Sequence, residues 1–194
     1  MALPPAAPER QLRHRRRIDI EIHARSDGLW EVDAQMQDVR ASEFRLRGGG
    51  VLAAGQPIHD MRLRIVVDAR FQIVDAGAHT AAMPYAGVCD AHGDLYARLI
   101  GLNLLDGFRR GVKERLGGVQ GCTHLTELTW VLPTAVVQAF AGEGLLDRVD
   151  DGGEPVQPMP IDRCHALRAD GPVVRAQFPR WYRAPPSSKA IEPP

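Results

Sequence analysis

Two short segments near the N-terminus alternate strictly between apolar and polar residues, and this pattern constrains the fold most. Residues 18–23 read Ile-Asp-Ile-Glu-Ile-His, and residues 30–36 continue the same alternation. A period of two places every second side chain on one face of a β-strand. Ser-Asp-Gly at residues 26–28 lies between the segments, and these residue types favour turns. The sequence therefore predicts a β-hairpin whose inward face carries Ile18, Ile20 and Ile22.

Two further segments are typical of strands. Residues 61–67 and 71–74 are rich in Leu, Ile, Val and Phe, and the second segment is expected to run on toward residue 80. Four strands joined by short links predict an antiparallel meander with one face in water.

The following part of the chain has apolar residues at helical spacing. We expect helices at residues 90–100, 105–116 and 123–140, the last with Pro133 as a kink. Its buried stripe consists of Leu125, Leu128, Leu132, Val136 and Phe140. A final strand is expected at residues 172–178. The predicted fold class is α+β: an antiparallel β-meander packed on a layer of about three helices, with a C-terminal strand.

The length and composition bound the class of protein. The 194 residues predict one α+β domain at 13–183, a mobile N-terminal arm at 1–12 and a disordered tail at 184–194. With 24 basic and 24 acidic residues the net charge is zero, which argues against a nucleic-acid partner. No apolar run approaches the roughly 20 residues of a membrane span. No secretion signal is recognised either, so we expect a cytoplasmic protein whose cysteines are thiols or ligands.

One local exception to the neutral charge is a basic run near the N-terminus, formed by Arg10, Arg13, Arg15, Arg16 and Arg17. It is either a solvated arm that leads into the first strand or a clamp for a carboxylate or phosphate, which guanidinium groups bind with two hydrogen bonds.

The segment Gly-Cys-Thr-His-Leu-Thr-Glu-Leu at residues 121–128 carries the candidate catalytic residues. Cys122 precedes the predicted helix, whose N-terminal partial charge favours a thiolate. His124 and Glu127 are three residues apart, so they share one helical face and can form a hydrogen bond. We interpret His124 as a base oriented by Glu127, with Cys122 beside it. A small buried cysteine and an ordinary surface pair are the alternative.

A metal site is an alternative for the same region. Cys122, His124, Cys164 and His165 are residue types that zinc binds, although adjacent Cys-His is an unusual half-site. We therefore expect no metal cofactor, and sulfurs too far apart to share an ion. The candidate substrate-binding residues are Arg109, Arg180, Trp181 and Tyr182, which combine guanidinium groups with aromatic faces. A solvated helix face and an aromatic plug over the sheet edge would explain these residues equally well.

Three strings resemble one known family: residues 118–128 (GVQGCTHLTEL), 164–167 (CHAL) and 178–181 (FPRW). They are similar to the bacterial domain-of-unknown-function family numbered 2889, over residues 15 to 181. The resemblance implies a link to the breakdown of aromatic compounds, through cofactor-free lyases that release formaldehyde from a hydroxymethyl side chain. In such a reaction His124, oriented by Glu127, would take the hydroxyl proton, and an arginine or tyrosine would hold a phenolate.

Three functions therefore compete. The first is a small-molecule lyase or hydrolase that acts on an aromatic or acidic metabolite, in a monomer or an oligomer. The second is a structural or sensing protein that binds zinc or iron. The third is a non-catalytic interaction module. The enzyme hypothesis predicts that His124 lines a largely apolar concavity, with Trp181, Tyr182 or an arginine nearby.

Overall fold

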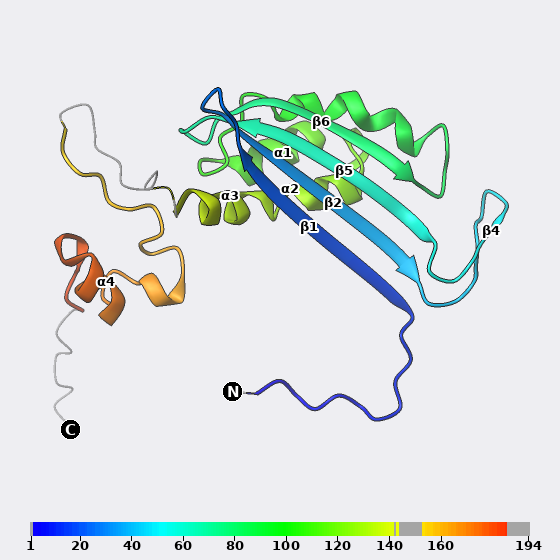
Figure 1. Ribbon diagram of the computed structural model, residues 1–194, viewed down its shortest axis with the longest axis horizontal. Coiled ribbons are helices and arrows are strands. Elements are labelled where there is room, and N and C mark those ends of the chain that lie inside the picture. The colour runs from blue at the N-terminus through cyan, green and yellow to red at the C-terminus, as the bar shows by residue number, and fades with distance from the viewer. Residues whose placement is uncertain (1, 142, 144–152, 186–194) are drawn as a thin grey trace, which may run out of the picture. The chain divides into compact units, whose positions relative to one another are not determined.

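The computed structural model of the chain describes residues 2–141, 143 and 153–185. Its contacts group the residues into two compact units, Met1–Ala139 and Phe140–Pro194. We had expected one domain over residues 13–183. Each unit is described by itself below, and Figure 1 shows the elements of both.

The first unit is built on a four-stranded antiparallel sheet (Figure 1). Its strands are β1 (His14–Ala24), β2 (Trp30–Arg40), β5 (Pro57–Val67) and β6 (Ile73–Ala82), in the order β1-β2-β5-β6. The short strands β3 (Phe44–Arg45) and β4 (Val51–Leu52) pair with each other in the link between β2 and β5. The predicted meander is therefore confirmed. Gly28, with φ of 81°, supplies the left-handed residue in the β1–β2 turn.

One face of the sheet forms the core. Val32, Ala34 and Met36 of β2 are buried, as are Met61, Leu63 and Ile65 of β5. Helices cover this face, and α2 (Thr123–Thr129) packs against β2 and β5 (Figure 1). The predicted inward residues of β1 lie opposite the buried residues of β2. They are covered less than predicted because β1 is an edge strand: Ile18 is 44% exposed, and Ile20 and Ile22 are half-buried.

The helices differ from the prediction in their type and ends. The segment predicted as a helix at residues 90–100 is a 3-10 helix, η1 (Cys89–Leu99), and α1 (Phe108–Leu116) begins three residues later than expected. The 3-10 turn η2 (Gly118–Gln120) joins α1 to α2.

The single kinked helix predicted at residues 123–140 is two helices, α2 and α3 (Leu132–Ala141). Pro133 is the second residue of α3, where its missing N–H group costs no hydrogen bond, so the chain breaks before the proline instead of bending at it. The predicted apolar stripe is confirmed, because all five of its residues are fully buried.

The second unit contains short helices: η3 (His165–Leu167), α4 (Pro172–Gln177) and η4 (Pro179–Trp181). Its small core consists of Ile161, Ala169 and Val174, with Leu167, Phe178, Trp181 and Tyr182 packed against it. The prediction of a strand at residues 172–178 is wrong. Gly171 precedes the helix and Pro172 occupies its first position, a combination that starts a helix. Most of the predicted disordered tail, residues 186–194, lies outside the described residues.

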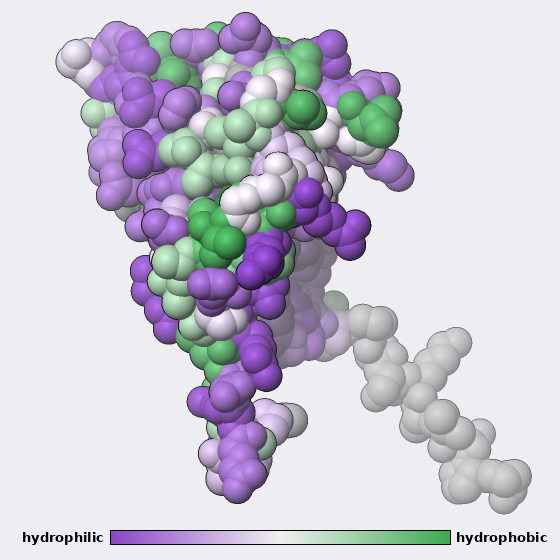
Figure 2. Space-filling view, turned by 90° about the vertical axis from the view of Figure 1, so that its right-hand side faces the viewer, coloured by the Kyte–Doolittle hydropathy of each residue, from purple (hydrophilic) through white to green (hydrophobic). Residues whose placement is uncertain are grey.

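None of the helices in the described ranges combines the length and the apolar character that crossing a membrane requires. On the face drawn in Figure 2, hydrophilic residues predominate and hydrophobic residues occur in small groups among them.

Candidate functional site

A cluster of polar side chains lies on the helix-covered face of the sheet, at the end where β1 begins and β2 ends. Arg16 of β1 pairs in register with Asp38 of β2, and Asp38 pairs in register with His59 of β5. Residues paired directly across strands point to the same face, so these three side chains form a row over three strands. The register of β2 and β5 shifts between Asp38 and Val39. Such irregularities re-aim side chains and are over-represented beside active sites.

Asp38 is the centre of this cluster. It is only 2% exposed. Its Oδ1 accepts hydrogen bonds from Nε2 of His14 at 3.0 Å and from Nε of Arg16 at 2.8 Å. Its Oδ2 accepts from Nη2 of Arg16 at 2.8 Å and from Nδ1 of His59 at 3.0 Å. Burial raises the pKa of Asp38, but the hydrogen bonds from Arg16 and His59 outweigh it and lower the pKa to about 2. Asp38 is therefore ionised at neutral pH.

The charge of Asp38 determines the tautomer of His59. An ionised carboxylate only accepts hydrogen bonds, so Nδ1 of His59 carries the proton that is donated to Asp38. In the neutral ring, Nε2 then has a free lone pair. The side chain of His59 is 14% exposed, so the ring is largely but not completely buried.

His124 of α2 is the second histidine of the cluster. Its ring centroid lies 3.9 Å from that of His59, with an angle of 36° between the rings. Asp38, His59 and His124 each offer one ligand atom within 4.8 Å of the others. His124 is half-buried. The structure thus places His124, which the sequence indicated, beside the pair Asp38–His59, which the sequence analysis did not identify.

Cys122 lies beside His124, immediately before α2. Its Sγ is 3.9 Å from Nδ1 of His124 and 3.9 Å from Sδ of Met61. Burial raises the pKa of Cys122. The contact with His124 and the backbone N–H groups at the start of α2 lower this pKa by a larger amount, so the net shift is downward. The hydroxyl of the buried Tyr96 holds this segment in place, because it donates to the Cys122 carbonyl at 2.9 Å and accepts from the Cys122 N–H at 3.1 Å.

Glu127 has a different partner from the one we expected. Its carboxylate accepts a hydrogen bond from Nη1 of Arg16 on β1, and no hydrogen bond joins it to His124 among the described residues. Arg16 therefore bridges Asp38 and Glu127. These bonds, with the one to Asp38 as the largest cause, raise the pKa of Arg16. The orienting carboxylate of the cluster is Asp38, and the histidine that it orients is His59.

The sequence reasoning missed Asp38 and His59, although a signal was present. Asp38 continues the inward phase of Ala34 and Met36 on β2, and His59 continues the inward phase of Met61 on β5. A charged or ionisable residue at an inward position must have a partner, because burial without one is costly. Extending each alternation by two residues would have marked both positions.

The predicted substrate-binding residues belong to both units, Arg109 to the first and the other three to the second. Arg109 is an exposed residue of α1. Arg180 forms an ion pair with Glu154 at 3.0 Å, and its guanidinium group lies 5.4 Å from the ring centroid of Trp181. Trp181 and Tyr182 pack on the core of the second unit.

The alternative zinc ligands are divided between the two units. Cys122 and His124 belong to the first unit, whereas Cys164 and His165 are exposed residues of the second. Among the described residues, Asp38, His59 and His124 have ligand atoms close enough to one another to hold a metal ion.

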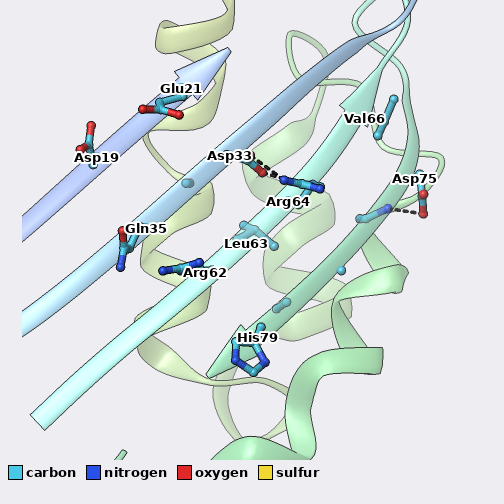
Figure 3. A pocket seen from close by; sticks show the side chains of 14 residues that line it. Asp19, Glu21, Asp33, Gln35, Arg62, Leu63, Arg64, Val66, Asp75 and His79 are labelled. Atoms are coloured by element: carbon cyan, nitrogen blue, oxygen red, sulfur yellow. Dashed lines mark hydrogen bonds and ion pairs between the residues drawn. The ribbon is translucent and has the colours of Figure 1, made fainter. Parts of the chain in front are cut away.

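The opposite face of the same sheet is hollowed, as Figure 3 shows. This open hollow of about 670 Å³ is lined by polar residues of all four strands, among them Glu21, Gln35, Arg62 and His79. Asp33 and Arg64 form a two-pronged ion pair there, with N–O distances of 2.6 and 2.7 Å. His124 does not line this hollow, whose lining combines charged residues with apolar ones. It therefore does not provide the apolar concavity that we predicted around His124.

Comparison with known proteins yields one match. Residues 14–138 match the profile of a family described as "Protein of unknown function (DUF2889)". The matched residues include β1, β2, β5, β6 and α2, and therefore the whole polar cluster around Asp38. No curated protein and no solved structure matches the chain.

Proposed function

Because the chain belongs to the DUF2889 family, whose function is unknown, we propose from the geometry of its site that it is a small-molecule enzyme of the acid–base type. The observation that carries the proposal is the arrangement of three side chains of the cluster, Asp38, His59 and His124. A buried, ionised carboxylate orients one histidine, and a second histidine lies 3.9 Å from the first, ring centre to ring centre. An oriented base with an open second nitrogen is what proton abstraction requires.

His59 is the general base of this proposal. Asp38 holds its Nδ1–H, so Nε2 can take a proton from a substrate. The imidazolium ion that forms is stabilised by the adjacent negative charge of Asp38, as in other carboxylate–histidine pairs. His124 lies where it can receive that proton or return one to the product, and Sγ of Cys122 lies 3.9 Å from Nδ1 of His124. His124 and Cys122 stay catalytic residues in this proposal, but the role of base, which the sequence analysis gave to His124, passes to His59.

The reaction class that we propose is a cofactor-independent lyase acting on an aromatic or acidic compound with a hydroxymethyl side chain. His59 removes the hydroxyl proton, the adjacent carbon–carbon bond breaks, and formaldehyde leaves. The electron pair of that bond forms a new double bond as a leaving group departs from the neighbouring carbon. All electrons stay in substrate and products, so the step needs no redox cofactor.

Arg16 is the proposed anchor for a negative charge on this substrate. Its Nε and Nη2 bind Asp38, whereas Nη1 binds Glu127, whose side chain is 45% exposed. An exposed ion pair contributes little to stability. A phenolate or carboxylate of the substrate can therefore replace Glu127 on Arg16 at small cost.

A second candidate function is a metal-dependent enzyme. Two histidines and one carboxylate form a ligand set that zinc and ferrous iron both accept. However, both oxygens of Asp38 already accept two hydrogen bonds each, and two of the four come from the cationic Arg16. A metal ion would have to displace the guanidinium group of Arg16 from Asp38, and the positive charge of that group would repel the ion. We therefore place the acid–base enzyme first.

The test is formaldehyde release from a panel of phenolic compounds that carry a hydroxymethyl side chain and a leaving group on the neighbouring carbon. We expect turnover by the wild type that chelators do not reduce. His59→Gln and His124→Gln should each lower turnover by about 10²- to 10⁴-fold, the usual contribution of a general acid or base. His23→Gln is the matched control, because His23 lies on β1 with a side chain that is 53% exposed.

Each other result counts against one part of the proposal. Turnover that chelators abolish and zinc or ferrous iron restores would establish the metal-dependent candidate instead. Turnover that neither His59→Gln nor His124→Gln changes would refute the site. An absence of formaldehyde release across the panel would refute the lyase assignment.

A further inference from the structure

The outer edge of β1 is long, regular and unpaired among the residues that the structure describes. All eleven residues of β1 pair with β2 in continuous register, without a shift. β1 is also the first strand in the sheet order, and no described strand lies beyond it. At about 3.4 Å per residue this edge is about 37 Å long. Free edges of this kind are usually protected by bulges, prolines, very short strands or charged side chains. β1 has no bulge and no proline and is eleven residues long, so charged side chains are the device that it carries.

The side chains of β1 on the helix-covered face are also incompletely buried. Ile18 is 44% exposed, while its partner on β2, Met36, is fully buried. Ile20 and Ile22 are half-buried beside the buried residues Ala34 and Val32. The apolar face of the sheet therefore ends at β1, and one more strand beside β1 would cover its isoleucine side chains.

The charges on the other face of β1 indicate which strand would pair with its free edge. Arg15 and Arg17 are followed by Asp19 and Glu21, so the row reads two positive and then two negative charges. Figure 3 shows Asp19 and Glu21 side by side on β1. If a second copy of β1 is placed antiparallel, with Ile18 opposite Ile18, then Arg17 faces Asp19 and Arg15 faces Glu21. The two-fold symmetry repeats both pairs, so all eight charges meet the opposite sign.

Other registers lose this match. Centring the pair one residue later places Asp19 opposite Asp19 of the second copy. Like charges directly opposite each other destabilise a pair of strands, whereas opposite charges stabilise it. We therefore propose that two copies of this chain associate through β1 in the Ile18-centred antiparallel register and form one continuous eight-stranded sheet.

This arrangement also adds residues to the candidate site, a consequence that rests on the function proposed above. In the same register Arg16 faces Ile20 of the second copy, and His14 faces Ile22 of the second copy. Arg16 and His14 both bind Asp38. Each site thereby gains an apolar wall from the second copy, next to the guanidinium group that would anchor the substrate.

The test measures the mass of the full chain in solution by sedimentation equilibrium or light scattering. We expect a dimer, with twice the 21.3 kDa of one chain. Asp19→Arg with Glu21→Arg makes the row entirely positive, and Arg15→Glu with Arg17→Glu makes it entirely negative. Each double variant should dissociate at least tenfold more readily than the wild type, and an equimolar mixture of the two should form a heterodimer.

A matched control and a folding check accompany these variants. Glu43→Arg with Asp75→Arg changes the charge of the chain by the same amount as the positive variant, but at exposed positions outside β1, so the dimer should persist. Circular dichroism should be the same for all variants, and recovery of a dimer in the mixture shows by itself that both double variants are folded.

Three results would overturn the proposal, whatever the outcome of the activity assays. The first is a monomeric wild type at about 100 μM, which would assign the edge of β1 to residues 140–194 or to another protein. The second is a dimer that neither double variant weakens. The third is a mixture that stays monomeric.

Discussion

Replacing Asp38 with asparagine removes the charge at the centre of the site while almost preserving the size of the side chain. Asp38 accepts four hydrogen bonds, from His14, His59 and twice from Arg16. The amide of asparagine brings an NH2 group toward donors that require an acceptor. The substitution therefore removes an ion pair and also sets donor against donor.

The magnitude follows from the pKa of Asp38. It is about 2 in the folded protein, against 3.8 for an ordinary aspartate. Each tenfold difference in acidity corresponds to about 1.4 kcal/mol, so the ionised form contributes about 2.4 kcal/mol to the free energy of unfolding at neutral pH. The side chain is only 3% exposed, so water screens this interaction little. With the mismatched amide included, we expect Asp38→Asn to lower the free energy of unfolding by about 2 to 4 kcal/mol at pH 7.

The pH dependence has a definite sign. Because folding lowers the pKa of Asp38, its contribution is complete well above pH 3.8 and is lost as the pH falls from 3.8 toward 2. About half of it is lost by pH 3. Asparagine does not titrate, so the difference between wild type and variant should narrow by about 1 kcal/mol between pH 7 and pH 3. Carboxylates such as Asp33, whose pKa is also lowered, titrate in both proteins and cancel in the difference.

The assay is denaturant unfolding of both proteins, followed by circular dichroism at pH 7, 5, 4 and 3. Protein concentration is held constant, because association makes apparent stability depend on concentration. A difference below about 1 kcal/mol at pH 7, within the range of an ordinary surface pair, would refute the reasoning. So would a difference that stays constant down to pH 3.

Three further predictions test other parts of the first unit. Glu127→Gln removes a partly exposed ion pair with Arg16, so the free energy of unfolding should fall by less than about 1 kcal/mol. A larger loss, measured by denaturant unfolding, would contradict the assignment of Glu127 as a displaceable partner. Leu128→Ala empties a fully buried position and should cost about 2 to 5 kcal/mol in the same measurement; a loss under about 1 kcal/mol would show that Leu128 is not in the core. Alkylation of Cys122 by iodoacetamide, followed by peptide mass mapping, should accelerate with a midpoint below the ordinary thiol pKa of 9.0, and a midpoint at or above that value would contradict the lowered pKa.

The elements that the sequence predicted correctly are those that depend on local pattern. The alternation at residues 18–23 and 30–36 has period two, and only a strand buries one face with that period. The stripe from Leu125 to Phe140 was also predicted as buried, because apolar residues at spacings of three and four need one buried face whether the helix is continuous or broken. The short segment 172–178 was predicted wrongly because seven residues carry too little periodicity to separate a helix from a strand.

The candidate site divides in the same way. The sequence by itself determined that Cys122 lies at the start of a helix and that His124 lies in its first turn, since both follow from one local motif. Only the tertiary structure decided which residues meet them. Asp38 binds Arg16 from 22 positions away and His59 from 21, and Glu127 meets Arg16 across 111 positions. These contacts depend on strand register and on how α2 packs over the sheet, which are properties of the folded chain that no local spacing specifies.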